Sequence, residues 1–307
     1  MSRIFVTGAT GFLGATIVQG IAQKHDICAL KRHTSDLSRI NAAIRQRVHW
    51  VNMAENWQNE VARFQPDVII HAAWIGVEAA ERNDWKLQLQ NIGFLYEVME
   101  LAVAGNVKKI IALGSQAEYG NISGIMKEDD PAIPTTAYGA VKTACSQILQ
   151  TFGNQHQVNW YWLRLFSFFG EGENENWLIP SVIKKIITTG KVDLTPGMQA
   201  YAYLYVKDLV NVVEKILQHN GDAGIYNISS NNAIKLRDLV EKIKMQLGLP
   251  CLLNFGAVPY RDQQPMHVQG DIEKFESKIG SFNITAFETA LIQTIDFYRR
   301  KYKTEMK

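Results

Sequence analysis

The stretch Thr7-Gly8-Ala9-Thr10-Gly11-Phe12-Leu13-Gly14 decides the fold, because it joins a short apolar run at residues 3–7 to a helical pattern at residues 15–23. Glycines let the main chain turn tightly and approach a pyrophosphate, and a helix N-terminus offers free N–H groups with a partial positive charge. Three glycines alone mark only a turn, but glycines placed between a strand and a helix predict a dinucleotide site. The expected cofactor contacts in this stretch are Gly8, Thr10, Gly11, Phe12, Leu13 and Gly14.

Apolar runs that alternate with helical patterns follow this turn through the first half of the chain. The runs lie at residues 26–30, 48–52, 67–73, 109–115 and 158–166 and are apolar on both faces. This alternation predicts an α/β protein with a Rossmann-like, doubly wound parallel sheet that is covered by helices on both sides. We expect this NAD(P)-binding domain to span residues 1–168.

The second half of the chain has a less regular pattern, with polar loops and isolated strands from about Gly170 onward. This pattern predicts that residues 169–307 form mainly a smaller C-terminal α/β lobe that faces the substrate. Two apolar stretches within residues 204–228, around Val206 and Ile225, are expected to return to the sheet of the first domain.

Composition argues against several classes of function. Lysine plus arginine (32) nearly balances aspartate plus glutamate (30), so the chain lacks the basic excess of a nucleic-acid-binding protein. No apolar run approaches the ~20 residues of a membrane span and no charged leader precedes the first strand, so a cytoplasmic protein without membrane contact is expected. Cys28, Cys145 and Cys251 are expected to be reduced, and the seven scattered histidines indicate no metal site.

The residues that follow the second expected strand bear on the choice of cofactor. An acidic side chain at this place binds the ribose 2′-hydroxyl of NAD, whereas a basic pair suits the 2′-phosphate of NADP. Lys31 and Arg32 stand there and favour NADP, with NAD as the alternative if both are ordinary loop residues in solvent. Ala72 and Ala73 end the fourth strand, where small side chains let the cofactor lie close.

A serine at a strand end and a tyrosine–lysine pair form the candidate catalytic set. Ser115 follows the fifth strand, and Tyr138 and Lys142 stand four residues apart on one helix face, where both also lie near the cofactor. The unperturbed pKa of tyrosine is about 10, but a neighbouring ammonium and a cationic nicotinamide both favour its phenolate. Tyr138 is therefore a candidate general acid or base, and Ser115 a candidate donor to the same substrate oxygen. A lone Y-x-x-x-K also occurs among ordinary surface residues, so the prediction depends on the order of the motifs along the chain. His71 has no partner motif, and we expect it to be a structural residue.

These motifs together resemble the extended short-chain dehydrogenase/reductase family of nucleotide-sugar epimerases, dehydratases and reductases. The resemblance covers essentially the whole chain. It implies a Rossmann-like NAD(P) domain, a small C-terminal sugar-nucleotide lobe, a Ser-Tyr-Lys catalytic set and a framework role for Asn91. The motifs that carry it are Thr7-Gly8-x-x-Gly11-Phe12-x-Gly14, His71-Ala72-Ala73, Ser115 followed by Tyr119-Gly120, Tyr138-x-x-x-Lys142, Arg164-x-Phe166 and Tyr205-Val206-x-Asp208.

Departures from the family pattern narrow the expected reaction. Dehydratases of the family carry an Asp-Glu pair just after the catalytic serine or threonine, where this chain has Gln116 and Ala117, so dehydration is disfavoured. Segments 114–120, 194–197 and 203–206 resemble bacterial reductases of nucleotide-linked 4-keto-6-deoxy sugars, such as the abequose synthases. Many relatives have Arg-Asp before the last of these segments, whereas this chain has Tyr201 and Ala202, so one phosphate contact is expected to be missing.

Substrate contacts are expected from both halves of the chain. By analogy with the family, Ser115, Gln116, Ser167 and Asn176 face the sugar or the nucleotide. Arg261 is a candidate for the diphosphate, because a planar guanidinium suits phosphate, but an ordinary surface arginine explains it equally well. Trp177 either stacks on a base or fills the core of the lobe, and the core is favoured.

The resulting hypothesis is an NAD(P)-dependent reductase of a nucleoside-diphosphate 4-keto-6-deoxyhexose, with hydride transfer to C4 and Tyr138 as the acid. A C4 epimerase of the same substrate class is the alternative, because it uses the same residues. A non-catalytic NAD(P)-binding sensor or assembly factor is the alternative of another class, since a fold does not determine a function. In the family, the helix that begins near Tyr138 and the helix at residues 84–104 often form a dimer interface, so a homodimer is expected.

Overall fold

The central element of the fold is a seven-stranded parallel sheet, in a computed structural model that describes residues 1–121, 123–262 and 264–305. The strand order is β12-β7-β5-β4-β1-β2-β3, and every neighbouring pair is parallel. This order confirms the predicted doubly wound α/β class. The strands are β1 (Arg3–Thr7), β2 (Asp26–Lys31), β3 (His49–Asn52), β4 (Val68–His71), β5 (Lys109–Leu113), β7 (Asn159–Leu165) and β12 (Gly224–Ile228).

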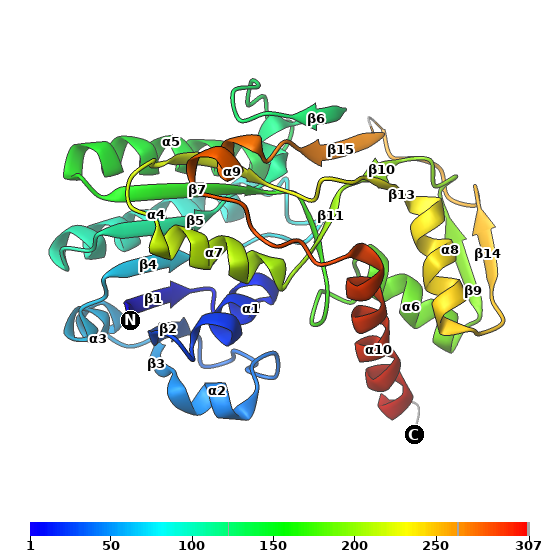
Figure 1. Ribbon diagram of the computed structural model, residues 1–307, viewed down its shortest axis with the longest axis horizontal. Helices are drawn as coiled ribbons and strands as arrows, with labels where there is room; N and C mark the ends of the chain where they lie inside the picture. The colour runs from blue at the N-terminus through cyan, green and yellow to red at the C-terminus, as the bar shows by residue number, and fades with distance from the viewer. Residues whose placement is uncertain (122, 263, 306–307) are drawn as a thin grey trace.

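Helices cover both faces of this sheet, as Figure 1 shows. On one face α1 packs against α7, and on the other α4 packs against both α3 and α5. Successive strand residues point to opposite faces, so Ile4 and Val6 join the core under α1 and α7, while Phe5 joins the core under α3, α4 and α5. The helices are α1 (Phe12–Ile21), α2 (Ala42–Arg47), α3 (Trp57–Phe64), α4 (Trp85–Ala104), α5 (Ala137–His156) and α7 (Asp208–Gln218).

The smaller lobe lies beyond the carboxyl ends of these strands, at the right of Figure 1. Helices α6, α8 and α10 pack together in it, and α6 also packs on β9. Its elements are α6 (Leu178–Thr188), β9 (Lys191–Leu194), α8 (Leu236–Leu247), β14 (Leu252–Phe255) and α10 (Phe287–Glu305). A four-stranded sheet, β13-β10-β15-β6, also lies outside the central sheet. It is made of β6 (Gly124–Met126), β10 (Ala200–Tyr201), β13 (Ile234–Lys235) and β15 (His267–Gly270), and α9 (Glu273–Lys278) packs against β12.

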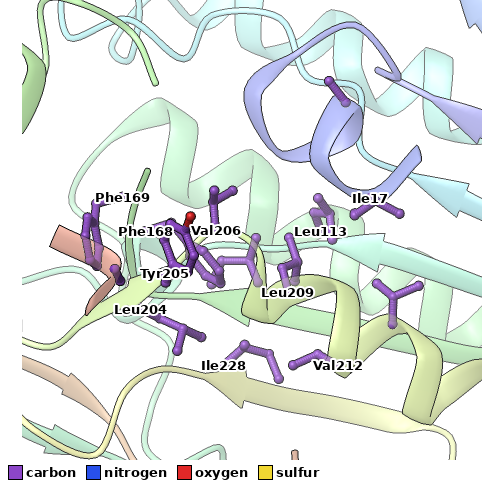
Figure 2. Close-up of a cluster of buried hydrophobic side chains, with 14 of the residues drawn as sticks. Ile17, Leu113, Phe168, Phe169, Leu204, Tyr205, Val206, Leu209, Val212 and Ile228 are labelled. Carbon is purple, nitrogen blue, oxygen red and sulfur yellow. The ribbon is translucent and has the colours of Figure 1, made fainter. Parts of the chain in front are cut away.

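Of the two stretches expected to return to the central sheet, only the second does so. Residues 224–228 form β12, the edge strand beside β7. The stretch before Val206 forms β11 (Tyr203–Tyr205), which pairs instead with β8 (Ser167–Phe169) in a separate two-stranded sheet. The expectation for β11 was wrong because its apolar residues report burial in the core rather than sheet membership: Leu204 and Phe168 lie together in the cluster of Figure 2.

Two further expectations from composition can be compared with the structure. Cys28, Cys145 and Cys251 are all free, and burial raises the pKa of the Cys28 and Cys145 thiols to about 12, which suits unreactive thiols. Among the described residues, no helix is both long enough and apolar enough to cross a membrane. The expected cytoplasmic location stays a prediction.

Candidate active site

The glycine turn lies against the end of β4. Gly8 has a φ of +68°, and a Cβ on it would stand 2.5 Å from the carbonyl carbon of Ala72. A Cβ on Gly14 would stand 2.1 Å from the Gly8 carbonyl oxygen. Both positions therefore need glycine, the first for its conformation and the second for close packing of α1 on the turn.

The first turn of α1 has the features of an anion site. Its N-cap is Gly11, which offers no side-chain acceptor, and no acidic residue stands in the first turn. The amide groups there are thus free of side-chain partners and point to where a pyrophosphate is bound in such turns. The turn fits a dinucleotide, and Gly8, Thr10, Gly11 and the first residues of α1 would hold it.

Two further groups of candidate cofactor residues lie at strand ends of the same sheet edge. Lys31 ends β2 half-buried and Arg32 follows it exposed, and neither forms an ion pair with any residue that the structure describes. Ala72 and Ala73 follow β4, with Ala73 donating its N–H to the Thr7 hydroxyl at 3.3 Å. Their basic and small side chains are available to a ligand at this edge.

His71 is buried beneath this edge and has a structural role. Its Nδ1 is 2.9 Å from the Thr7 hydroxyl. Burial, and next the charge of Lys142, lower the pKa of His71 to about 3, so the ring is neutral in the physiological range. His71 is thus a hydrogen-bonded core residue, as expected.

Ser115, Tyr138 and Lys142 come together between β5 and α5. Thr136 caps α5 by accepting the Gly139 N–H at 3.1 Å, which sets the start of the helix that carries the other two residues. Tyr138 and Lys142 are only 8% and 4% exposed, so they are not the surface residues of the competing interpretation. The Ser115 side chain lies near enough to the Tyr138 phenol to lower its pKa.

The Lys142 ammonium lies beneath the phenol. It donates to the Leu113 carbonyl at 2.5 Å and stands 5.9 Å from the centre of the Tyr138 ring. Burial lowers the pKa of Lys142 to about 7, and the charge of Glu118 acts in the opposite direction. Burial raises the pKa of Tyr138, and the charge of Glu118 adds to this shift, whereas the Ser115 side chain and the charge of Arg82 oppose it. Burial therefore moves the pKa values of Tyr138 and Lys142 in opposite directions, and both shifts favour the neutral form of the side chain.

Two side chains from the loop between β4 and α4 complete the surroundings of Tyr138, and sequence reasoning missed them. Trp74 meets the Tyr138 ring edge-on at 5.9 Å, and the Lys142 ammonium lies 3.6 Å from a Trp74 ring centre. Arg82 places its guanidinium 5.0 Å from the centre of the Tyr138 ring, and its carbonyl accepts the Tyr138 N–H at 2.8 Å. No local sequence motif indicates these contacts, because they arise from the path of the thirteen-residue loop at residues 72–84.

Helix α4 holds that loop through two buried amides. The Asn91 side chain accepts the Ile75 N–H at 2.8 Å and donates to the Ile75 carbonyl at 3.1 Å. The Gln88 side chain donates to the Gly76 carbonyl at 2.7 Å and accepts the Trp74 indole N–H at 2.9 Å. The framework role implied for Asn91 thus has a direct structural basis, and Gln88 shares it.

The expected substrate residues are more dispersed. Gln116 is half-buried beside Ser115, and Ser167 is half-buried in β8. Asn176 and Arg261 are exposed, and within the described part of the chain no hydrogen bond or ion pair joins either of them to Ser115, Tyr138 or Lys142. Their roles stay predictions.

The expectation that Trp177 fills the lobe core was wrong. Its side chain is 37% exposed and it stands at the N-cap of α6, because the helix begins directly after the polar loop that carries it. The amphipathic pattern of α6 buries the next turn instead, through Ile179, Pro180 and Val182.

Comparison with known proteins places this arrangement in a family. The model of the NAD dependent epimerase/dehydratase family matches residues 4–229, which include the glycine turn and the candidate catalytic residues Ser115, Tyr138 and Lys142. The chain belongs to this family. As a member of the extended short-chain dehydrogenase/reductase group, it is an NAD-dependent oxidoreductase or epimerase.

Individual relatives match most of the length of this family member. CDP-abequose synthase of Salmonella muenchen is 28% identical, with 86% of this chain and 87% of that protein covered. The dTDP-4-dehydro-6-deoxyglucose reductase of Escherichia coli is 23% identical, with 90% of this chain and 91% of that protein covered.

Solved structures share the fold. The UDP-N-acetylglucosamine 4-epimerase of Methanobrevibacter ruminantium M1 superposes with a TM-score of 0.87 at 22% identity, covering 98% of this chain and 99% of its own. The UDP-glucuronic acid 4-epimerase of Bacillus cereus, solved with UDP-glucuronic acid and NAD, has a TM-score of 0.84 at 18% identity, covering 98% and 100%. At these identities the likeness establishes the fold alone.

Proposed function

We propose that this family member reduces the C4 carbonyl of a nucleoside-diphosphate 4-keto-6-deoxyhexose, with NADPH as the reductant. The observation that carries the proposal is the buried constellation of Ser115, Tyr138 and Lys142 beside the glycine turn. Two relatives named for abequose synthesis and for reduction of a 4-dehydro-6-deoxy sugar support the substrate class.

The bound dinucleotide supplies the hydride to C4. Ser115 and Tyr138 bind the carbonyl oxygen from one side, and the Tyr138 phenol donates its proton as charge develops on that oxygen. The Lys142 ammonium, 5.9 Å from the phenol ring, favours the phenolate that remains. The product is a C4 hydroxyl, and Tyr138 regains its proton from solvent.

Two positions argue against a dehydratase. Elimination of water needs an acid and a base next to the catalytic serine, and Gln116 and Ala117 occupy these places with a neutral amide and a methyl group. Neither can exchange a proton near neutral pH. An epimerase needs no such pair, so the C4 epimerase is the second candidate, supported by the fold that this chain shares with solved 4-epimerases.

The preference for NADPH rests on Lys31 and Arg32. Two cations without ion-pair partners among the described residues stand at the end of β2, where the adenosine ribose is bound in this fold. We expect NADPH to bind more tightly than NADH, and Arg32→Ala to reduce that ratio by about tenfold while leaving NADH binding unchanged. Equal binding of the two cofactors to the wild-type protein would instead assign NAD.

The function is tested by mixing the protein with NADPH and a panel of nucleotide-linked 4-keto-6-deoxy sugars. A reductase consumes one NADPH for each sugar reduced, and Tyr138→Phe abolishes this. Steady conversion of a 4-hydroxy sugar into its C4 epimer without net change of the cofactor would replace the reductase by the epimerase.

We also infer that two copies of the chain associate through α4 and α5. Apolar residues on α4 recur at spacings of three and four, which places them on one stripe of the helix. Trp85, Leu89, Tyr96 and Val103 of this stripe are 57%, 51%, 54% and 44% exposed. Beside the stripe lies a shallow apolar hollow lined by residues of both helices, including Met99, Ile148 and Phe152. A monomer would leave this surface in water.

A further inference from the structure

Glu118 is a fully buried carboxylate next to the catalytic trio. It lies in the single-turn helix η1 (Gln116–Tyr119), and its side chain is 0% exposed. Its Oε1 accepts the backbone N–H of Ser115 and the indole N–H of Trp162, both at 2.8 Å. Its Oε2 accepts from Arg164 Nε at 2.8 Å, in an ion pair whose arginine side chain is only 5% exposed. An ionised carboxylate accepts and never donates, so three convergent N–H groups select the charged form.

This carboxylate connects directly to Ser115. The Ser115 side chain accepts the Ala117 N–H at 3.2 Å while Glu118 accepts the Ser115 N–H, which makes a reciprocal capping box over η1. The backbone of Ser115 is thereby held from both sides. The position of the Ser115 hydroxyl, which lowers the pKa of the Tyr138 phenol, follows from this backbone.

The same carboxylate lies near Lys142, because the Lys142 ammonium stands 5.6 Å from the centre of a Trp162 ring and the Trp162 indole N–H donates to Glu118. Burial drives the pKa of Lys142 down to about 7, and Glu118 is the main group that opposes the shift. The other ionisable groups facing Lys142 are Tyr138 and Cys145 on its own helix and His71 on β4. His71 is neutral in this range and burial keeps the Cys145 thiol protonated, so neither replaces Glu118. Arg164 shares the carboxylate and Arg82 faces Tyr138 from the other side.

We propose that Glu118 is a positioning residue whose buried charge keeps the Lys142 ammonium protonated and whose bond to the Ser115 backbone fixes the serine hydroxyl. The proposal rests on the proposed hydride-transfer role of Ser115, Tyr138 and Lys142. A purely structural role, in which Glu118 only fills space and satisfies Trp162 and Arg164, is the competing explanation. The two differ in whether charge or shape matters at this position.

Two variants separate charge from shape. Glu118→Gln keeps the size and one acceptor oxygen but removes the charge. Glu118→Asp keeps the charge on a side chain shorter by one methylene. If the charge matters, Asp retains more activity than Gln; if only shape and hydrogen bonding matter, Gln retains more.

The pH dependence of kcat gives the first readout. Lys142 must be charged to favour the Tyr138 phenolate, so activity falls as pH rises through the pKa of Lys142 in the complex. Loss of Glu118 lowers that pKa, and the alkaline limb of the profile moves to lower pH by about one unit or more in Glu118→Gln. In Glu118→Asp the limb stays near its wild-type place. An unmoved limb in Glu118→Gln would overturn the charge role.

A second readout needs neither substrate nor cofactor, so it stands even if the proposed reaction is wrong. The Trp74 ring centre lies 3.6 Å from the Lys142 ammonium, so the indole N–H resonance of Trp74 reports the charge on Lys142. With isotope-labelled tryptophan the chain has seven indole resonances, and Trp74→Phe assigns this one. We expect it to titrate in the wild-type apoprotein, to titrate at lower pH in Glu118→Gln, and not to titrate in Lys142→Met.

The combined outcomes are decisive for Glu118. A lower Trp74 midpoint in Glu118→Gln with a wild-type midpoint in Glu118→Asp supports the proposal, even if no nucleotide sugar is turned over. The same midpoint in all three proteins overturns it. If Glu118→Gln fails to fold, Glu118→Asp is compared with the milder Trp162→Phe. Trp162→Phe removes one hydrogen-bond donor to Glu118 and keeps the charge. A Trp74 midpoint that is lowered in Trp162→Phe alone would assign the effect to packing.

Discussion

Tyr138 is buried, and charged and polar neighbours act on its phenol group. Its ring faces Trp74 and Arg82, and the Lys142 ammonium stands 5.9 Å from the ring centre. Burial alone would hold the proton on the phenol, and the neighbouring cations and the serine ease its release. Such a phenol can act as an acid without being ionised in the resting protein.

Tyr138→Phe tests whether the phenol oxygen of Tyr138 takes part in the reaction. Removal of the hydroxyl leaves the ring contacts with Trp74 and Arg82, so we expect NADPH to bind as before while kcat falls by about 100- to 10,000-fold. The measurement is steady-state turnover beside a fluorescence titration of NADPH and a thermal melt. Full turnover in a variant that binds cofactor normally would remove Tyr138 from the reaction.

Glu173 allows a test of how the burial of a carboxyl group affects the free energy of unfolding. Its side chain is 6% exposed, and its Oε2 has no hydrogen-bond partner among the described residues. Burial raises the pKa of Glu173 to about 8 from an ordinary value of 4.5, so the folded chain holds a proton that the unfolded chain releases between these values. Below pH 4.5 the carboxyl group is protonated in both states, so its burial costs no proton release. As the pH rises from 4.5 towards 8, the free energy of unfolding of the protein falls.

Glu173→Gln removes this titration. We expect the variant and the wild type to have similar unfolding free energies at about pH 4.5, and the variant to become more stable by a few kcal/mol near pH 8, at about 1.4 kcal/mol for each unit of pKa. Urea unfolding at a series of pH values measures the difference, in which all other titrations cancel. A difference that does not change with pH would mean that Glu173 is ionised in the folded chain.

At the scale of residues, the sequence predicted residues that belong to local motifs and missed residues that reach the site only through tertiary packing. Ser115, Tyr138 and Lys142 could be proposed as a catalytic set because three motifs occur in a fixed order along the chain, and their catalytic role stays a prediction. Trp74 and Arg82 carry no local signal. Glu118 does carry one, since Ser115-x-x-Glu118 is the pattern of a capping box, but its burial and ion pair appear only once β7 is placed beside η1.

At the scale of elements, the loop between β4 and α4 is positioned by the helix that follows it. Gln88 is 0% exposed and bridges the Gly76 carbonyl and the Trp74 indole. Replacement by Leu leaves these two groups buried without partners, and each lost partner costs about 1–3 kcal/mol. We expect Gln88→Leu to unfold at lower denaturant and, because Trp74 is released, to lower kcat more than Gln90→Leu does. Gln90 is exposed on the same helix and bonds only a backbone carbonyl of its own helix at 3.3 Å, which makes it a matched control.

The strands show where element prediction succeeds. Residues 3–7 were predicted and found without change as β1, and the other expected central strands differ by at most two residues at an end. An apolar run flanked by polar turns marks a buried strand reliably in an alternating α/β chain. The same signal could not show that β11 pairs with β8, because the choice between two buried sheets depends on contacts between segments distant in sequence.

At the scale of the whole molecule, predictability falls from the first half of the chain to the second. The family model ends at residue 229, and the lobe beyond it is built from short strands and amphipathic helices whose order admits several arrangements. Trp177 illustrates the limit: an indole in a polar loop suits a core or a surface equally, and the start of α6 decides for the surface. The dinucleotide-binding motif can therefore be recognised in this sequence, whereas the substrate contacts depend on how the second lobe folds.

The apolar stripe on α4 makes the assembly testable. In a two-fold dimer every residue of the interface occurs twice, so Leu89→Glu would bury two carboxylates against an apolar surface. Since an unpaired buried charge costs several kcal/mol and each 1.4 kcal/mol is a factor of ten, we expect the dissociation constant to rise by about two orders of magnitude or more.

Sedimentation of the wild type, of Leu89→Glu and of Met245→Glu over a wide concentration range measures this change. Met245 is 76% exposed on α8, in the opposite lobe, and its replacement should leave the dimer intact. Leu89→Glu should sediment near the 34.7 kDa of one chain at concentrations where the other two sediment near twice that mass. A wild-type protein that sediments as a single chain throughout this range would contradict the dimer.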